Sequence, residues 1–157
     1  MKLAIQVAAG LLVVWLYMEL FVLPWGNDKE SAKRLACLSN TKQQATALLI
    51  YASEHDERFP RSSVWMSALA PYTRPESDFF HHPGPNPRIV GYAFNDVLSG
   101  EKAPPLSETV PMTYDSTNLG PNAHDRFATL PRPGRHDGKN SVSYADGHAR
   151  RVVAKAP

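Results

Sequence analysis

The chain has little cysteine, little net charge and none of the short motifs that mark common active sites. Its single cysteine, Cys37, excludes an intrachain disulfide, so we expect a small buried thiol on a helix face. The net charge of +2 and the absence of a dense Lys/Arg run exclude a basic nucleic-acid-binding surface. There is no G-x-S-x-G elbow, G-x-G-x-x-G turn or G-x4-G-K-[ST] phosphate loop. We therefore expect no enzymatic activity and no nucleic-acid partner.

Long apolar sequence is confined to the N-terminus. From Leu3 to Trp25 the only strongly polar side chains are Gln6 and Glu19. A run of this length can cross a hydrocarbon core of about 30 Å. A cleaved signal peptide would have a shorter apolar region followed by a small-x-small site, whereas this run ends in bulky residues. We predict a retained transmembrane anchor over residues 1–26 and a soluble domain over residues 27–157.

Glu19 is the one carboxylate inside the apolar run. A carboxylate within a membrane span is a functional candidate. Alternatively, Glu19 lies about 9 Å along the helix from Trp25 and reaches toward the lipid headgroups. The second interpretation assigns it no function.

Two soluble helices are predicted after the apolar run. The first is capped at Asn27 with Glu30 three residues later, and it ends near His55 before Pro60. Its apolar face is formed by residues at steps of three and four: Leu35, Leu38, Ala45, Leu48, Leu49 and Ala52. A short helix over residues 62–70 follows.

The rest of the soluble part is predicted to contain short strands and long loops. Fourteen prolines and nine glycines, concentrated between residues 60 and 138, favour a loop-rich structure. Strand-like runs lie at 88–94, 109–114, 140–146 and 148–153, with loops at 95–108 and 115–135. The apolar stripe of the helix needs a partner, and these strands are the candidates. We predict an α+β fold in which a long N-terminal helix, with membrane and soluble parts, packs on a small antiparallel β-sheet.

The most informative pattern lies near the C-terminus, where His136 is followed by nine residues and then Asp146-Gly147. Apolar and polar residues alternate before this Asp-Gly pair, and a second strand-like run follows it. This pattern predicts a hairpin with a type I′ turn. We hypothesise that His136 and Asp146 form a hydrogen-bonded pair that fixes the turn, without a catalytic role. Gly134 and Gly138 would let the preceding loop fold back.

Histidine and aspartate residues raise the question of a metal site. The candidate ligands for zinc are imidazoles and carboxylates from separate loops: His81 and His82 in a turn, then His124, Asp125, His136 and Asp137, and finally Asp146 and His148. For calcium they are Asp115, Asp125, Asp137 and Asn140. Neither set shows a recognised ligand spacing. We therefore expect no cofactor, with zinc or calcium as the alternative.

Several segments together carry a resemblance to a known family. The C-terminal pattern resembles the H-X9-DG signature of prepilin-like proteins, relatives of type IV pilins and type II secretion pseudopilins. The segments Cys37–Gln43 and Leu48–Ala52, followed by His55–Pro60, resemble the family's C-x-S-N-x-K-Q, Y-A and D-x-R-F-P stretches. Two weaker blocks, Gly91–Asn95 and Met112–Ser116, also match, so the resemblance covers most of residues 37–153.

The resemblance implies a single-pass protein of the inner (cytoplasmic) membrane with an extracytoplasmic, periplasmic C-terminal domain. Lys29, Lys33 and Arg34 would place that domain in the cytoplasm by the positive-inside rule, and we follow the resemblance. The implied partners are membrane lipid, other pilin-like subunits and secretion-system components. The implied function is a non-catalytic structural or interaction protein of a type II secretion or type IV pilus-like system.

The chain departs from the family at the processing site. The family has Gly followed by Phe, with a glutamate five residues into the mature helix that pairs with a neighbouring subunit's amino terminus during assembly. The resemblance implies such an assembly role for Glu19. Here Leu11 follows Gly10 and the fifth position is Trp15. The alternative function is therefore a membrane-tethered extracytoplasmic module that binds a metal or surface ligand and does not assemble into filaments.

Overall fold

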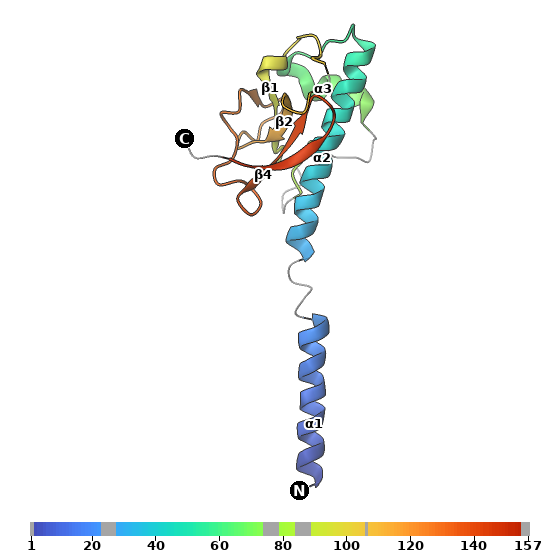
Figure 1. Ribbon diagram of the computed structural model, residues 1–157, viewed down its shortest axis with the longest axis vertical. Helices are drawn as coiled ribbons and strands as arrows, with labels where there is room; N and C mark the ends of the chain where they lie inside the picture. The colour runs from blue at the N-terminus through green and yellow to red at the C-terminus, as the bar shows by residue number, and fades with distance from the viewer. Residues whose placement is uncertain (1, 23–27, 74–78, 84–88, 106, 155–157) are drawn as a thin grey trace. The chain divides into compact units, whose positions relative to one another are not determined.

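The computed structural model describes residues 2–22, 28–73, 79–83, 89–105 and 107–154 (Figure 1). The chain divides into two compact units, Met1–Lys33 and Arg34–Pro157. The predicted boundary between anchor and soluble domain, at residues 26 and 27, lies outside the described residues.

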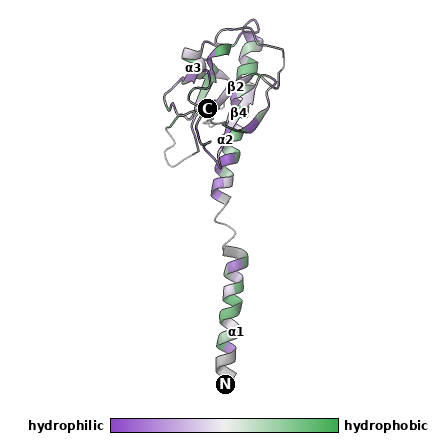
Figure 2. Cartoon of the chain, turned by 60° about the vertical axis from the view of Figure 1, so that its left-hand side comes forward, coloured by the Kyte–Doolittle hydropathy of each residue, from purple (hydrophilic) through white to green (hydrophobic). Residues whose placement is uncertain are grey.

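The N-terminal unit contains the helix α1 (Lys2–Tyr17) and the π-helical turn η1 (Met18–Val22). Figure 2 shows the apolar character of α1. Among the described helices, none combines the length and the apolarity that a bilayer crossing requires. The predicted transmembrane anchor and the predicted location as a single-pass inner-membrane protein, with a periplasmic domain, are therefore wrong.

A second helix, α2 (Asp28–Glu54), crosses into the second unit. The predicted helix with an end near His55 is confirmed, and the two residues Asp56 and Glu57, with φ of 53° and 61°, terminate it. The long N-terminal helix predicted to join a membrane part to a soluble part is not shown. The structure has α1 and α2 as separate helices, with residues 23–27 outside the described residues.

The buried stripe of α2 differs from the predicted one at its start. Its fully buried members recur at three- and four-residue steps: Cys37, Thr41, Gln44, Ala45, Leu48. Leu35, which was predicted to belong to the apolar face, is 67% exposed because it lies two residues, about 200° of helix, from Cys37. Gln44 is tolerated in the core because its side-chain amide donates to the Phe79 carbonyl at 2.7 Å.

The predicted short helix over 62–70 is confirmed as a 3-10 turn, η3 (Ser62–Val64), followed by α3 (Trp65–Leu69) and a second turn, η4 (Ala70–Tyr72). Trp65 and Leu69, four residues apart, are both completely buried. The spacing therefore predicted correctly which face of this helix packs inward.

Five strands form one sheet in the order β3-β1-β2-β4-β5. The strands are β1 (Tyr92–Asn95), β2 (Pro111–Asp115), β3 (His124–Asp125), β4 (Lys139–Tyr144) and β5 (Ala149–Val153). Four of them are antiparallel neighbours, as predicted, but β3 pairs with β1 in parallel. The sheet is thus mixed, because two residues of a predicted loop add an edge strand. A 3-10 turn, η5 (Asp96–Leu98), also interrupts the predicted loop after β1.

Both faces of the sheet are covered. On one face the core joins α2 and α3 to sheet residues, including Leu48, Trp65, Phe94 and Met112. On the other face Ala93, Tyr114 and Val142 pack under Phe127 and Leu130 from the loop that follows β3. The long segment 116–135 is therefore a structural cover, which explains why β1 is buried along its whole length.

The hairpin predicted at the C-terminus is confirmed, since β4 and β5 pair antiparallel from Lys139 to Ser143. The predicted type I′ turn at Asp146-Gly147 is wrong, because only Gly147 has positive φ, 87°. The turn with positive φ at both central residues is the other Asp-Gly pair, Asp137 at 49° and Gly138 at 70°. The Asp-Gly signal thus indicated the correct turn type at the wrong position.

Candidate functional site

Three potential metal ligands that are far apart in the sequence meet beside α2. Cys37 Sγ lies 3.3 Å from His136 Nε2, and His136 Nε2 lies 3.2 Å from His82 Nε2. All three ligand atoms lie within 4.8 Å of one another. Cys37 and His136 are buried and His82 is half-buried. Thiolate and imidazole are ligands that zinc and copper prefer.

Each of the three residues is positioned by backbone structure. Cys37 belongs to the buried stripe of α2. His82 follows the bridge between His81 and Val90, and its N–H donates to the Ile89 carbonyl at 3.0 Å. His136 begins the type I′ turn, in which it exchanges backbone hydrogen bonds of 3.0 and 3.1 Å with Lys139. The Arg151 guanidinium also donates to the His136 carbonyl at 2.6 Å.

The histidine rings are oriented with their nitrogen edges toward each other. The ring planes of His82 and His136 are within 11° of parallel and their centroids are 5.3 Å apart. The Nε2 atoms are closer than the centroids, at 3.2 Å. Two facing nitrogens this close cannot both carry a hydrogen along the line that joins them, so at least one directs a lone pair into the cluster.

A second layer of polar groups surrounds Cys37. The buried Tyr92 hydroxyl is hydrogen-bonded to the Cys37 side chain, and the Asn40 amide donates to the same hydroxyl at 3.2 Å. Burial and the neighbouring Cys37 and Asp115 raise the pKa of Tyr92 far above its usual range. Tyr92 is therefore a neutral hydrogen-bond donor at every physiological pH.

Asp115, at the end of β2, is a buried carboxyl beside this layer. Burial raises its pKa, while the Ser141 N–H and the charges of Arg135 and His136 act to lower it. One carboxylate oxygen accepts from Ser141 N at 2.6 Å, and the other has no hydrogen-bond partner among the described residues. A buried oxygen in this state is costly unless a positive charge lies near it.

The predicted His136–Asp146 pair is not found. The two residues flank the six-residue strand β4, which separates them by more than about 17 Å of extended chain. The Asp146 carboxylate accepts from the side chain and the backbone N–H of His148, at 2.5 and 3.0 Å. Burial acts to raise the pKa of Asp146, but these hydrogen bonds and the charge of His148 outweigh burial and lower the pKa.

Most of the predicted zinc ligands lie apart from one another. His124 pairs with Asp96 at 2.9 Å, Asp125 bonds to Tyr114 and Thr129, and Asp137 pairs with Arg34. Two of the predicted candidates, His82 and His136, meet in one cluster, together with Cys37, which was not predicted as a ligand. Of the proposed calcium ligands, Asn140 bonds the Pro131 carbonyl and the Arg135 N–H, so its amide holds a loop. Glu19 lies exposed in η1.

Sequence reasoning missed Cys37 and His82 as partners of His136. The three residues have separations of 45 and 54 positions, and no ligand motif has such spacing. The adjacent pair His81-His82 before Pro83 was the available signal, but it does not indicate which residues lie opposite.

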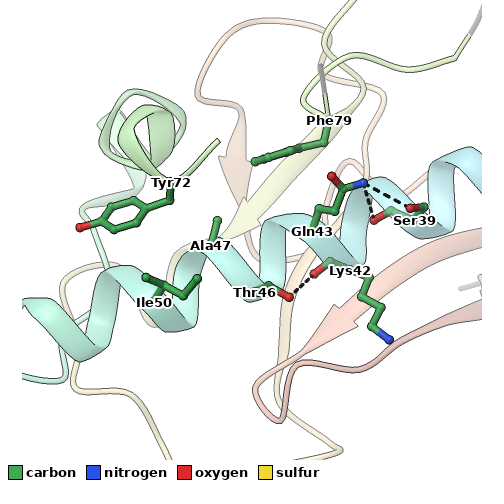
Figure 3. Close-up of a pocket in the computed structure, with 8 residues that line it drawn as sticks. All are labelled: Ser39, Lys42, Gln43, Thr46, Ala47, Ile50, Tyr72 and Phe79. Atoms are coloured by element: carbon green, nitrogen blue, oxygen red, sulfur yellow. Dashed lines mark hydrogen bonds between the residues drawn. The ribbon is translucent and has the colours of Figure 1, made fainter. Parts of the chain in front are cut away.

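A separate groove of about 540 Å³ runs along the outer side of α2 (Figure 3). Its lining is Ser39, Lys42, Gln43, Thr46, Ala47, Ile50, Tyr72 and Phe79. Figure 3 shows Gln43 turned back to Ser39 and the Thr46 hydroxyl bonded to the Lys42 carbonyl, so these polar groups serve the helix itself. Lys42 is the only charged residue in this lining, which contains no carboxylate.

Asp125 is predicted to make the free energy of unfolding depend on pH in the acid range. Burial acts to raise its pKa, but hydrogen bonds from Thr129, Tyr114 and two backbone N–H groups outweigh it and lower the pKa. The stabilisation is therefore complete above the ordinary value of 3.8 and is lost as the pH falls through the lower folded-state pKa. We expect Asp125→Asn to lose about 1 kcal/mol at pH 7 and less at pH 3, measured by urea unfolding.

The matched control for this prediction is Asp56→Asn. Asp56 is exposed and has φ of 53°, which asparagine adopts equally well. We expect its free energy of unfolding to follow that of the wild type across the pH range. A constant deficit of Asp125→Asn from pH 7 to pH 3 would contradict the assignment.

No family model, curated protein or solved structure matches the chain.

Proposed function

We propose that the chain is a non-catalytic, pilin-like interaction protein that assembles with further copies of itself through α1. The observation that carries the proposal is the apolar surface of α1 and η1. Ten large apolar side chains there are 42–67% exposed: Val7, Leu11, Leu12, Val13, Val14, Trp15, Leu16, Tyr17, Met18 and Leu20. They lie on all sides of the helix. A helix that is apolar all round is stable in water only when it is buried.

A second copy of the same helix is the partner that this surface fits best. The surface of an apolar helix has few polar groups that would make it specific for a partner helix of different sequence. Copies that pack side by side bury the same residues on each other, as in a symmetric bundle. Glu19, the carboxylate in this segment, would then require a cationic partner from a neighbouring copy, such as an amino terminus.

The second unit supports the pilin-like part of the proposal. The α+β arrangement, with α2 against a small sheet, agrees with the fold that the resemblance implies. The H-X9-DG segment forms the type I′ turn at Asp137-Gly138, the strand β4 and the Asp-Gly turn that leads into the edge strand β5. We propose subunits of a type II secretion or type IV pilus-like system as the wider class of partners.

The proposal predicts that a charge on α1 prevents self-association. We expect the full chain to form oligomers in sedimentation velocity experiments and Leu12→Glu to weaken that association at least about tenfold, because it buries an unpaired carboxylate. Leu12 is 58% exposed, so circular dichroism of the variant monomer should retain the wild-type signal of the second unit.

Val97→Glu is the matched control, because Val97 is 55% exposed but lies in the second unit. It should associate like the wild type. The proposal is wrong if the wild type stays monomeric at all concentrations, or if both variants weaken association equally. It is also wrong if the wild type binds only lipid vesicles and does not associate with itself.

A further inference from the structure

We propose that Cys37, His82 and His136 bind one transition-metal ion of the zinc and copper class. The site combines one thiolate and two imidazoles, a ligand set that suits these borderline-soft ions and does not suit calcium or magnesium. It is independent of assembly through α1, because all three residues lie in the second unit.

The separations of the ligand atoms are those of a shared metal. Two nitrogens at about 2.0–2.1 Å from a tetrahedral zinc lie about 3.4 Å apart, and a nitrogen and a sulfur lie about 3.6 Å apart. The observed distances are 3.2 Å between the histidine nitrogens and 3.3 Å between Cys37 Sγ and His136 Nε2. The third separation, between Cys37 Sγ and the ligand nitrogen of His82, lies within 4.8 Å.

The lone pairs and hydrogen-bond donors around the three ligand atoms also favour a metal. At least one of the facing Nε2 atoms already presents a lone pair, as the 3.2 Å separation requires. The Tyr92 hydroxyl donates toward Cys37 and is itself held by Asn40, and such a donor stabilises a thiolate. An ion in the cluster would replace one proton on a histidine nitrogen and one on sulfur.

Asp115 supplies an independent observation. It is completely buried and its second oxygen has no hydrogen-bond partner within the described part of the chain. A divalent ion bound by one thiolate and two neutral imidazoles carries one net positive charge. The charge of Arg135 already offsets part of the cost of burying Asp115, and the charge of a bound ion beside His136 would offset more of it.

A metal ion at this site would keep one free coordination position and would cross-link three segments of the chain. Three protein ligands leave one position of a tetrahedral ion for water or another donor. His82 is half-buried, so the ion reaches the cluster from its side. Bound metal would tie α2 to residue 82 and to the turn before β4, segments that are otherwise joined by noncovalent contacts alone.

The test is metal binding to the full chain after treatment with a chelator. We expect one equivalent of Zn²⁺ to bind in a calorimetric titration and to raise Tm by several degrees. Co²⁺ in place of Zn²⁺ should give a thiolate-to-metal charge-transfer band, which reports coordination by Cys37 directly. His82→Gln should weaken Zn²⁺ binding at least about 100-fold without unfolding the domain, because His82 is half-buried.

His124→Gln is the matched control, since His124 is an exposed histidine at the sheet edge, outside the cluster. It should bind Zn²⁺ like the wild type. Preference for copper, seen as displacement of Zn²⁺ and an intense visible band with Cu²⁺, would support the same site with a different ion. The proposal is overturned if no stoichiometric ion binds, if the Co²⁺ spectrum lacks the thiolate band, or if His82→Gln binds as well as His124→Gln.

Discussion

Trp65→Ala is expected to destabilise the second unit by about 3–5 kcal/mol, the range for removing a large buried aromatic side chain. Trp65 is completely buried. Its ring stacks on Phe94 with centroids 5.9 Å apart and meets the edge of Phe80 at 5.5 Å. Its indole N–H donates to the Ala123 carbonyl at 3.0 Å. The substitution would remove these contacts together and leave a cavity between α3 and the sheet. Urea unfolding followed by far-ultraviolet circular dichroism measures the loss.

Two further variants separate the causes of this effect. Trp65→Phe retains an aromatic ring but removes the indole donor, so we expect a smaller loss, roughly 1–2 kcal/mol. Val64→Ala changes the neighbouring residue, which is 47% exposed, and should alter stability by less than about 0.5 kcal/mol. If Trp65→Ala lowers the free energy of unfolding by less than about 1 kcal/mol, and the slope of that free energy against urea concentration is unchanged, Trp65 is not the centre of this core.

Gly134→Ala is expected to destabilise the protein by about 2–3 kcal/mol and to disturb the turn that holds His136. A Cβ atom at residue 134 would lie 2.5 Å from the carbonyl carbons of Gly138 and Lys139 and closer still to the Lys139 nitrogen. These are backbone atoms, which cannot rotate away. Gly134 also forms a bridge with Gly138. The methyl group would therefore push apart the two sides of the loop that leads into β4.

Gly120→Ala is the matched control, because the nearest atom to its added Cβ is the Asn118 side-chain oxygen at 3.3 Å. We expect a loss of less than about 1 kcal/mol there. Chemical shifts of the His136 ring should change in Gly134→Ala and stay unchanged in Gly120→Ala. Equal stability of the two variants would mean that the close approach at Gly134 is relieved by loop movement.

The local elements were predictable because their signals are short-range. Apolar residues spaced three and four positions apart predicted α2 and the buried pair Trp65 and Leu69. Alternation and Asp-Gly predicted the β4–β5 hairpin. The predicted turn type at Asp146 was wrong because Asp-Gly also occurs in hairpin loops where the glycine alone has positive φ, as Gly147 does here.

Long-range pairings were not predictable in the same way. The edge strand β3 has two residues, so its sequence carries no alternation, and it pairs in parallel with β1 only because the covering loop returns beside that strand. Gly134 was expected to need conformational freedom, but its φ is not in the left-handed region and its requirement is space. Space depends on which backbone lies opposite, and only the folded chain defines that.

The amino-acid sequence by itself determined the helix α2, the short helix at Trp65, the C-terminal hairpin and the α+β class, because each depends on neighbours within about ten residues. The tertiary structure alone decided that His136 meets Cys37 and His82 rather than Asp146, and that Asp115 is buried with an electrostatic interaction to His136. Those contacts join residues about 20 to 100 positions apart. Their geometry is set by how α2 packs on the sheet, which no local pattern of side chains encodes.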